Sequence, residues 1–451
     1  MSKLKVNDVI KVDVNKIVSE GKGLAYFDKR AIFVNRGLPG DCVDVVIKTK
    51  KKSYYLANIT HFHKKSDFRS DSECSHFPIC GGCQYMDVSY SNQLQLKKEM
   101  LLDVIHQFYP ELKSVLSDII PSKEVIFYRN KMEFSFSSNK EGIICGLKKR
   151  HTFDEVIPVN NCLLQDKQTS FLLDSIVTYM KENNINDCAS DQDNSFLKHV
   201  MVRHSKKHNQ FMINLFITEK NESFFKDFVS YLQQQNPALV SAHLTYHDQK
   251  IGHPTTQTIL SSIGDSHLVE SLDWLNCHIS PLSFFQTNST QALVLYDTIK
   301  SVADLKASDR ILDLYCGTGT IGLFLSQHVN HVIGIEENPY AIEDAKLNTK
   351  KNNIKNIEYR CGRVKNILKF ESFDVDCVIV DPPRSGMVPK ALKRLCDLKC
   401  KKIIYVSCHP VTLLRDLKEF QKHNYKISTF IPVDMFPNTF HIESVVKLEL
   451  N

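Results

Sequence analysis

Two loops near the carboxyl end of the chain carry residues that could do covalent chemistry. Cys408 follows the apolar run 403–406, and Asp381 follows the apolar run 378–380. Ligands of an open α/β sheet bind outside the carboxyl ends of its strands, so we expect both loops to border one pocket. A cysteine there can act as a nucleophile once its thiolate form is favoured.

A glycine-rich segment about 65 residues earlier predicts what the pocket binds. Residues 311–322 read as a strand, a tight turn and a helix start, and Gly317, Gly319 and Gly322 have the G-x-G-x-x-G spacing. Glycine at such a turn allows positive φ and a close approach of the backbone to a ligand. Glu336 ends the next apolar run, where a carboxylate can accept both ribose hydroxyls of an adenosine cofactor.

The charges around this turn indicate which cofactor the pocket binds. Asp313 precedes the glycines and Asp381 opens the later loop. These carboxylates favour the positively charged sulfonium of S-adenosylmethionine, whereas a pyrophosphate prefers a helix N-terminus free of acid. A nicotinamide cofactor is the alternative.

Five ordered motifs in this part of the chain resemble those of the RNA uracil-C5 methyltransferases, which make 5-methyluridine in tRNA and 23S ribosomal RNA. They are D-L-Y-C-G-x-G at 313–319, D-P-P-R-x-G at 381–386, S-C-x-P at 407–410, S-F-F-Q-x-N at 283–288 and H-x-E-x-V at 441–445. The resemblance implies a Rossmann-like class I methyltransferase domain over 276–451. It also implies that Cys408 is the nucleophile and Glu443 the base. The cofactor-binding residues that we expect are Gln286, Tyr315, Gly317, Glu336 and Asp381.

Uracil chemistry explains why such an enzyme needs both a thiol and a base. C5 of uracil is too weak a nucleophile to attack a methyl group, but a thiolate that adds to C6 turns C5 into an enolate carbon. A base must then remove the C5 proton so that the thiolate can leave. The target base has to leave its stack, so we expect a loop or unpaired uridine as substrate.

The chain contains 14 cysteines, and one group of them is tightly spaced: Cys74-x5-Cys80-Gly-Gly-Cys83. No apolar signal segment follows Met1 and no apolar run approaches the ~18 residues of a membrane span, so we expect a cytoplasmic protein without membrane contact. Thiolates at this spacing suit an iron–sulfur cluster or zinc, and a fourth ligand is needed. The candidates are Cys145, Cys162 and Cys188.

The resemblance to the 23S rRNA branch of the family implies Cys162 as the fourth ligand and a structural 4Fe–4S cluster held by Cys74, Cys80, Cys83 and Cys162. A structural zinc on the same sulfurs is the alternative. Because tRNA enzymes of this family generally lack the cluster, it favours 23S rRNA as the partner, with tRNA as the alternative.

The remaining chain predicts two more domains. Residues 1–62 contain short apolar runs punctuated by glycine and proline, the size of an OB-like barrel, and look like the family's RNA-binding TRAM domain. Lys52 and Tyr55 belong to a lysine and tyrosine stretch that fits RNA contact. An α/β central domain is expected over 63–275, and its amphipathic helix 93–108 resembles one that packs on the catalytic domain. We expect a monomer.

The net charge of +6 permits RNA binding without demanding it, so local basic groups matter more. Such groups occur at Arg129 with Lys131 and at 148–151.

Three rival functions remain: a non-catalytic RNA-binding protein, a DNA cytosine-C5 methyltransferase and an N-methyltransferase. The cysteine and the base disfavour the first, the barrel and cysteine group disfavour the second, and Arg384 after the prolines disfavours the third. Residues 360–364 lack the family's side chain for adenine, so no residue is assigned there.

Overall fold

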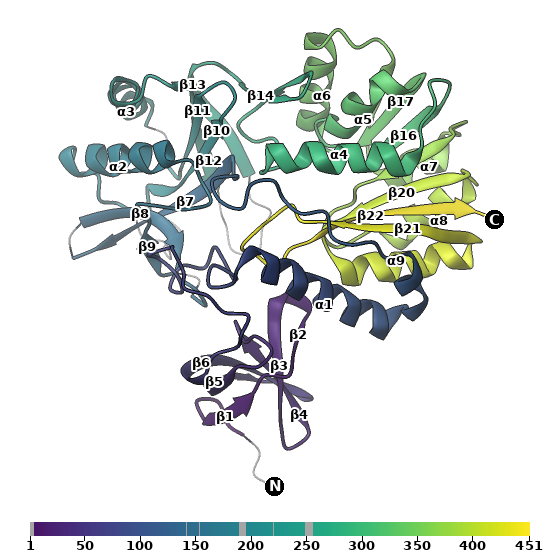
Figure 1. Ribbon diagram of the computed structural model, residues 1–451. Helices are drawn as coiled ribbons and strands as arrows, with labels where there is room; N and C mark the ends of the chain where they lie inside the picture. The colour runs from purple at the N-terminus through teal and green to yellow at the C-terminus, as the bar shows by residue number, and fades with distance from the viewer. Residues whose placement is uncertain (1–3, 141, 153, 189–194, 220, 249–255) are drawn as a thin grey trace.

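A computed structural model describes residues 4–140, 142–152, 154–188, 195–219, 221–248 and 256–451. The remaining positions, which include residues 1–3 of the expected barrel, lie outside the described part. The chain forms a small barrel, a central sheet with two helices and a larger α/β unit that holds the C-terminus (Figure 1). No helix among the described residues is long and apolar enough to cross a membrane.

The barrel is built from strands whose side chains point alternately into the core and toward the surface. In β5, Val43, Val45 and Ile47 are fully buried, as the period of two along a strand requires. The described residues of this unit form six strands, in the order β1-β5-β6-β4-β3-β2. Their bounds are β1 Val9–Asp13, β2 Lys16–Val18, β3 Lys22–Phe27, β4 Arg30–Asn35, β5 Cys42–Lys50 and β6 Tyr54–Lys64, with a short 3-10 turn η1 at Ser19–Gly21.

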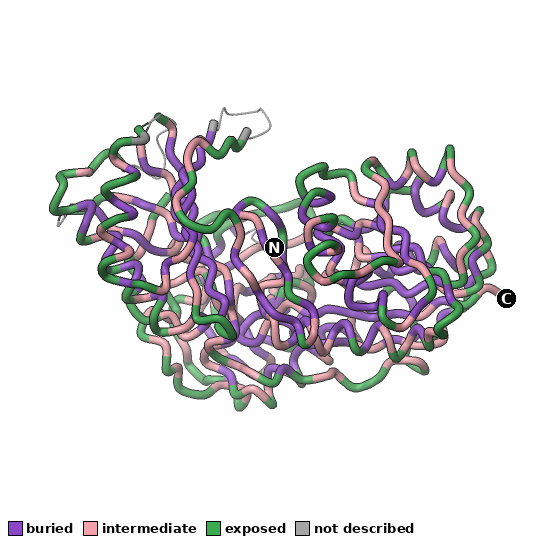
Figure 2. The backbone as a smooth tube through the Cα atoms, turned by 90° about the horizontal axis from the view of Figure 1, so that it is seen from above, coloured by how far each residue is buried: buried purple, intermediate pink, exposed green. Residues whose placement is uncertain are grey.

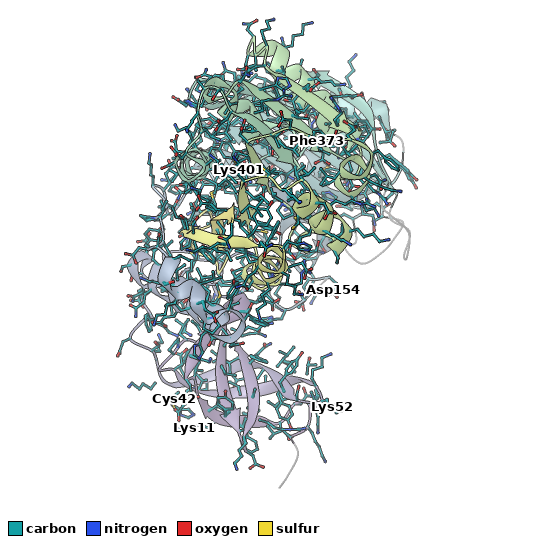
Figure 3. All side chains as sticks on the ribbon, turned by 90° about the vertical axis from the view of Figure 1, so that its right-hand side faces the viewer. Lys11, Cys42, Lys52, Asp154, Phe373 and Lys401 are labelled. Atoms are coloured by element: carbon teal, nitrogen blue, oxygen red, sulfur yellow. The ribbon has the colours of Figure 1, made fainter. Side chains whose placement is uncertain are left out.

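One aromatic residue of the expected RNA contact is instead part of the barrel core. Tyr55 is 1% exposed, and its hydroxyl accepts a hydrogen bond from Arg30 at 2.9 Å. Its position in β6 places it on the inner face of the sheet, so it offers no stacking platform. Lys52 lies at the outer edge of the barrel, on the opposite side from Lys11 and Cys42 (Figure 3).

The helix α1, Tyr90–Phe108, joins the barrel to the rest of the molecule. An apolar cluster combines Ile17 and Leu38 of the barrel with Leu96 and Met100 of α1 and with Ile442 near the C-terminus. The opposite end of the helix packs Leu101, Val104 and Ile105 on the sheet of the C-terminal unit. A 3-10 turn η2, Pro110–Val115, follows the helix.

The central sheet has the strand order β13-β12-β11-β10-β7-β8-β9. Apolar residues of α2 and α3 cover one face of this sheet and form a core of their own with it (Figure 1). The elements are β7 Lys131–Asn139, β8 Gly142–Lys148, β9 Val156–Pro158, α2 Lys167–Glu182, β10 Leu197–Ser205, β11 Gln210–Ile217, α3 Glu222–Gln235, β12 Leu239–Asp248 and β13 Thr256–Gly264.

A hairpin leads into the C-terminal unit. It consists of β14, Leu268–Leu272, and β15, Leu275–Ile279, and the expected boundary at residue 275 falls inside it. Leu272 and Leu275 both belong to the apolar core of the C-terminal unit, which shows that the hairpin packs with that unit.

The C-terminal unit is a layered sheet with the order β18-β17-β16-β19-β20-β22-β21, in which only β22 among the described strands runs against its neighbours. Its inner strands β16, β17, β19 and β20 are buried along nearly their whole length, and buried backbone runs through the interior of this unit as it does through the central sheet (Figure 2). The strands are β16 Arg310–Leu314, β17 His331–Glu336, β18 Ile357–Cys361, β19 Cys377–Val380, β20 Lys402–Ser407, β21 Tyr425–Val433 and β22 Glu443–Leu450.

Helices cover both faces of this sheet. One core joins the sheet to α1, α7, α8 and α9, and a second core joins its other face to α4 and α5. The helices are α4 Ser289–Ala303, α5 Thr320–Leu325, the 3-10 turn η3 Ser326–His328, α6 Pro339–Lys351, α7 Val364–Phe370, α8 Pro389–Asp397 and α9 Pro410–Lys422. This is the doubly wound arrangement that the glycine turn predicted, with the loops after β16, β17, β19 and β20 on one edge.

Candidate active site

Strand pairing brings Cys408 and Glu443 together. Ser407, the last residue of β20, pairs with Ser444 of the antiparallel β22. The next pair of positions is Cys408 and Glu443, so the two side chains lie opposite each other where the strands end. Glu443 is 6% exposed, whereas Cys408 is half-buried and borders a small recess. A thiol and a carboxyl group are thus brought to the same edge of the sheet although 35 positions separate them in the sequence.

Side chains of α9 hold the two loops around this pair. The carboxylate of Asp416 accepts hydrogen bonds from the backbone N–H of Met387 at 2.8 Å and from the hydroxyl of Tyr405 at 2.6 Å. The Thr412 hydroxyl donates to the carbonyl of Arg384 at 3.0 Å. The loop that starts at Asp381 is therefore tied to the helix that follows Cys408.

The electrostatics of this edge are strongly acidic and poorly compensated. Burial, and then the proximity of Asp381, raise the pKa of Glu443 to about 8 and that of Asp313 to about 8. Burial raises the pKa of Asp381 itself to about 6. Such a group of desolvated carboxyls gains most from a cationic ligand, because a nearby positive charge stabilises their ionised forms.

The same surroundings suppress the thiolate of Cys408. Burial, followed by the charges of Glu443 and Asp381, raises the pKa of the thiol to about 12, although the charge of Arg384 and a backbone hydrogen bond act in the other direction. The N-terminus of α9 begins two residues later and favours a negative charge, but it does not outweigh these effects. Without a ligand, Cys408 is therefore a weak nucleophile.

The glycine turn presents backbone and carboxylate groups to a ligand. Gly317 has φ +54°, and its N–H donates to one oxygen of Glu336 at 3.1 Å, while Asn338 N–H donates to the other at 2.8 Å. Gly319 has φ +76°, and a Cβ there would lie 2.8 Å from the hydroxyl of Tyr359. The turn thus orients Glu336 at the tip of β17, and its glycines cannot be exchanged for larger residues without strain.

A cavity of about 260 Å³ lies beside this turn, and Tyr315, Glu337, Arg363, Val364 and Pro383 are among the residues that line it. Arg363 and Val364 follow β18, in the stretch to which the sequence assigned no residue. In the sequence, this stretch could be located only by its position after the third strand of the unit, because it contains no acidic or amide side chain.

Gln286 belongs to a loop that the central domain holds in place. The side chain of Asn130 donates to the Gln286 carbonyl at 3.0 Å, and the Asn130 N–H donates to the Thr287 carbonyl at 2.8 Å. Asn130 had not been identified from the sequence, since only the fold brings it to this loop. Of the two neighbouring aromatic residues, Phe285 is a core residue at 3% exposure, whereas Phe284 is 69% exposed.

Cys74, Cys80, Cys83 and Cys162 all line one cavity of about 700 Å³. Burial raises the pKa of the Cys80 and Cys162 thiols, and nearby thiols of the same group raise them further. Arg150 holds the loop by donating to the carbonyls of Cys80, at 2.8 Å, and Cys83. Among the described residues, however, no three His, Cys, Asp or Glu side chains are gathered closely enough to hold a metal ion.

The walls of the same cavity are basic. Its basic lining residues come from the barrel, from the start of the central sheet and from the turn after β8, and outnumber Glu20 and Glu133. The two basic groups that the sequence indicated, around Arg129 and around Arg150, are thus brought together. The basic lining residues are Lys22, Arg36, Arg129, Lys131, Lys148, Lys149 and Arg150, with His151 beside them.

Comparison with known proteins decides the family. The family described as tRNA (Uracil-5-)-methyltransferase matches residues 89–451, and the TRAM domain matches residues 3–59. The chain belongs to the RNA uracil-5 methyltransferase family. It carries this family's TRAM domain at its N-terminal end, where the barrel is found.

Members of the family resemble the chain over nearly its whole length. An uncharacterised RNA methyltransferase of Caldanaerobacter subterraneus is 34% identical over 445 residues, covering 98% of this chain and 99% of that protein. One from Thermotoga maritima is 35% identical, covering 97% and 98%. The solved structure of Pyrococcus abyssi tRNA (uracil-54, C5)-methyltransferase in complex with S-adenosyl-L-homocysteine has 28% identity and a TM-score of 0.78, with 97% and 99% covered. The chain is therefore an RNA methyltransferase by family.

Proposed function

We propose that this protein methylates C5 of a uridine in RNA through a covalent bond between Cys408 and C6 of the base. The observation that carries the proposal is the pairing of Ser407 with Ser444, which puts the adjoining Cys408 and Glu443 at the same end of β20 and β22. A thiol and a buried carboxyl side by side supply the two groups that uracil C5 chemistry requires.

In the proposed reaction the Cys408 thiol loses its proton to solvent and the resulting thiolate forms a bond to C6. The C5=C6 electron pair becomes the enolate that forms a bond to the methyl carbon. S-adenosylmethionine supplies that methyl group from a sulfonium, whose sulfur keeps the electron pair of the broken bond. Glu443 then accepts the C5 proton, the C5=C6 bond re-forms, and the electrons of the C6–S bond return to the Cys408 sulfur. Asp381 and Glu336 serve to hold the cofactor, Glu336 at its ribose, with Tyr315, Gly317 and Gln286 beside them.

The charge of the site supports an ordered activation of Cys408. Glu443 and Asp381 raise the pKa of its thiol in the ligand-free protein, and a cation bound next to Asp381 offsets that charge. The thiolate is then favoured when the methyl donor is present, which prevents a futile adduct with RNA.

For the substrate we propose 23S ribosomal RNA. The barrel and the basic cavity supply an RNA-binding surface, since lysine and arginine side chains neutralise backbone phosphates. The cysteine group supports the ribosomal branch of the family. The P. abyssi relative acts on tRNA, which makes tRNA the second candidate.

We also propose that Cys74, Cys80, Cys83 and Cys162 hold a 4Fe–4S cluster. Four soft sulfur donors around one cavity fit such a group in kind, although the thiols are not gathered to bonding distance. A zinc ion on the same sulfurs is the alternative. Bound metal would tie the loop around Cys74–Cys83 to Cys162, which stabilises the fold next to the RNA-binding surface.

The experiment that tests the function is methyl transfer from labelled S-adenosylmethionine to purified RNA, followed by digestion to nucleosides. The proposal expects label in 5-methyluridine from 23S rRNA with the wild type and with Cys42→Ala, a matched change on the barrel, but none with Cys408→Ala. Label only in tRNA keeps the chemistry and changes the substrate. Label in cytosine, or in a nitrogen-methylated base, contradicts the proposal.

A further inference from the structure

The connection between β21 and β22, residues 434–442, is held by side chains from one face of α1. The ammonium of Lys97 donates to the carboxylate of Asp434 at 2.6 Å and to the carbonyl of Phe436 at 3.1 Å. Both charged side chains are 0% exposed. The hydroxyl of Tyr90, two turns earlier on the helix, donates to the other oxygen of Asp434 at 3.1 Å.

A second contact joins the same helix face to the middle of the 434–442 segment. The Gln93 amide donates to the Asn438 side chain at 2.9 Å, and the Asn438 N–H donates back to the Gln93 side-chain oxygen at 2.7 Å. Gln93 is 1% and Asn438 4% exposed, and Asn438 has φ +66°. A buried, reciprocal amide pair fixes both the position and the unusual backbone conformation of this residue.

Both ends of the segment meet at Glu443. Val433, the last residue of β21, pairs with Glu443, the first residue of β22, so Asp434 leaves the sheet directly beside the proposed base. Ile442 at the other end packs against Leu96 and Met100 of α1. Any movement of the segment relative to α1 therefore displaces Glu443 or rotates its backbone.

We propose that α1 is a clamp that positions Glu443 for removal of the C5 proton, with Lys97 and Gln93 as its positioning residues. The inference rests on the proposed function. It assigns a role in removal of the C5 proton to α1, a helix that lies far from the catalytic motifs in the sequence. Cys408 follows β20 and leads directly into α9, whose Thr412 hydroxyl donates to the carbonyl of His409 at 3.1 Å. The clamp therefore acts on proton removal and not on formation of the thioether bond.

A separation of the two steps tests this. For Lys97→Met we expect methyl transfer in a single turnover within about threefold of wild type, because Cys408 keeps its supports. Decay of the covalent adduct should slow at least tenfold, because Glu443 is displaced, so that a denaturation-resistant adduct accumulates on ordinary RNA. Gln93→Met should show the same pattern more weakly, because Gln93 pairs with the neutral Asn438 and its loss leaves no buried charge unpaired. Lys98→Met changes a surface lysine on the next position and should behave as wild type.

A merely structural role gives a different result. If methyl transfer and adduct decay slowed by the same factor in Lys97→Met and Gln93→Met, the clamp proposal would be wrong. It would also be wrong if neither rate changed in variants of normal thermal stability. The adduct with 5-fluorouridine RNA needs no proton removal, so it should form normally in both variants. If wild-type protein formed no adduct with that RNA, the proposed function would have failed and not the clamp alone.

Discussion

The reactivity of Cys408 gives a quantitative prediction about the ligand-free enzyme. Burial and the charges of Glu443 and Asp381 raise the pKa of the thiol from 9.0 to about 12. At pH 8 this lowers the thiolate fraction about a thousandfold relative to an ordinary thiol. The more basic thiolate is about 16-fold to 32-fold more nucleophilic, so the net reaction with an alkylating reagent is slower by about 30-fold to 60-fold. Water at the half-exposed side chain reduces the effect further.

The assay is alkylation by iodoacetamide, followed by mass spectrometry of the Cys408 peptide and compared with a short cysteine peptide. Exposed Cys361 in the same chain reports that the reagent reaches the protein. Adding S-adenosylmethionine should accelerate alkylation, by about 3.5-fold for each unit by which the cation lowers the pKa of Cys408. S-adenosylhomocysteine lacks the positive charge and should accelerate it little.

Two outcomes refute this reasoning. Cys408 could react as fast as the cysteine peptide in the ligand-free protein, which would mean that its neighbours do not suppress the thiolate. Alternatively, both cofactor forms could have equal effects, which would mean that the sulfonium charge does not act on the thiol.

Other predictions concern the base, the cysteine group and the glycine turn. Glu443→Gln should trap the methylated adduct on ordinary RNA, seen as a shifted band on a denaturing gel, and a variant that turns over normally would remove Glu443 from the mechanism. Because only the ionised carboxylate accepts a proton and its pKa is raised to about 8, decay of a preformed wild-type adduct should accelerate with pH up to about 8; a flat profile between pH 6 and 8 would contradict the assignment. Cys80→Ser should lose bound iron and visible absorbance while Cys42→Ser keeps both, and full iron in the first variant would refute the ligand set. Gly319→Ala should lower stability by about 1–2 kcal/mol, because it forces a side chain into the left-handed region, and calorimetry should show weaker cofactor binding.

The sequence predicted those parts of the protein in which an apolar run that indicates a strand is followed directly by a motif. The strand–glycine turn–helix at 311–322 and the loops at Asp381 and Cys408 lie where a doubly wound sheet puts them. The barrel could be predicted from its short apolar runs, but the inward direction of Tyr55 could not, since period two allows either face for a given residue until the register is known.

Contacts between distant segments were out of reach for sequence reasoning. The hydrogen bonds from Asn130 to the Gln286 loop and from Lys97 to Asp434 join residues more than 150 positions apart. A lysine in an amphipathic helix reads as a surface residue, and only its buried carboxylate partner shows otherwise. That Arg363 and Val364 line a cavity beside the glycine turn follows only from the fold, since neither residue type marks a binding site in the sequence.

The central claim is that Cys408 bonds to C6 of a uridine. The most direct test is incubation of the protein with S-adenosylmethionine and 23S rRNA that carries 5-fluorouridine, since fluorine at C5 cannot leave as a proton and so blocks elimination. The account predicts a denaturation-resistant protein–RNA adduct with wild type, whose RNA-linked peptide contains Cys408, and no adduct with Cys408→Ala. The same adduct with tRNA alone would move the substrate and keep the chemistry. An adduct that survived Cys408→Ala, or none with either RNA, would contradict the account.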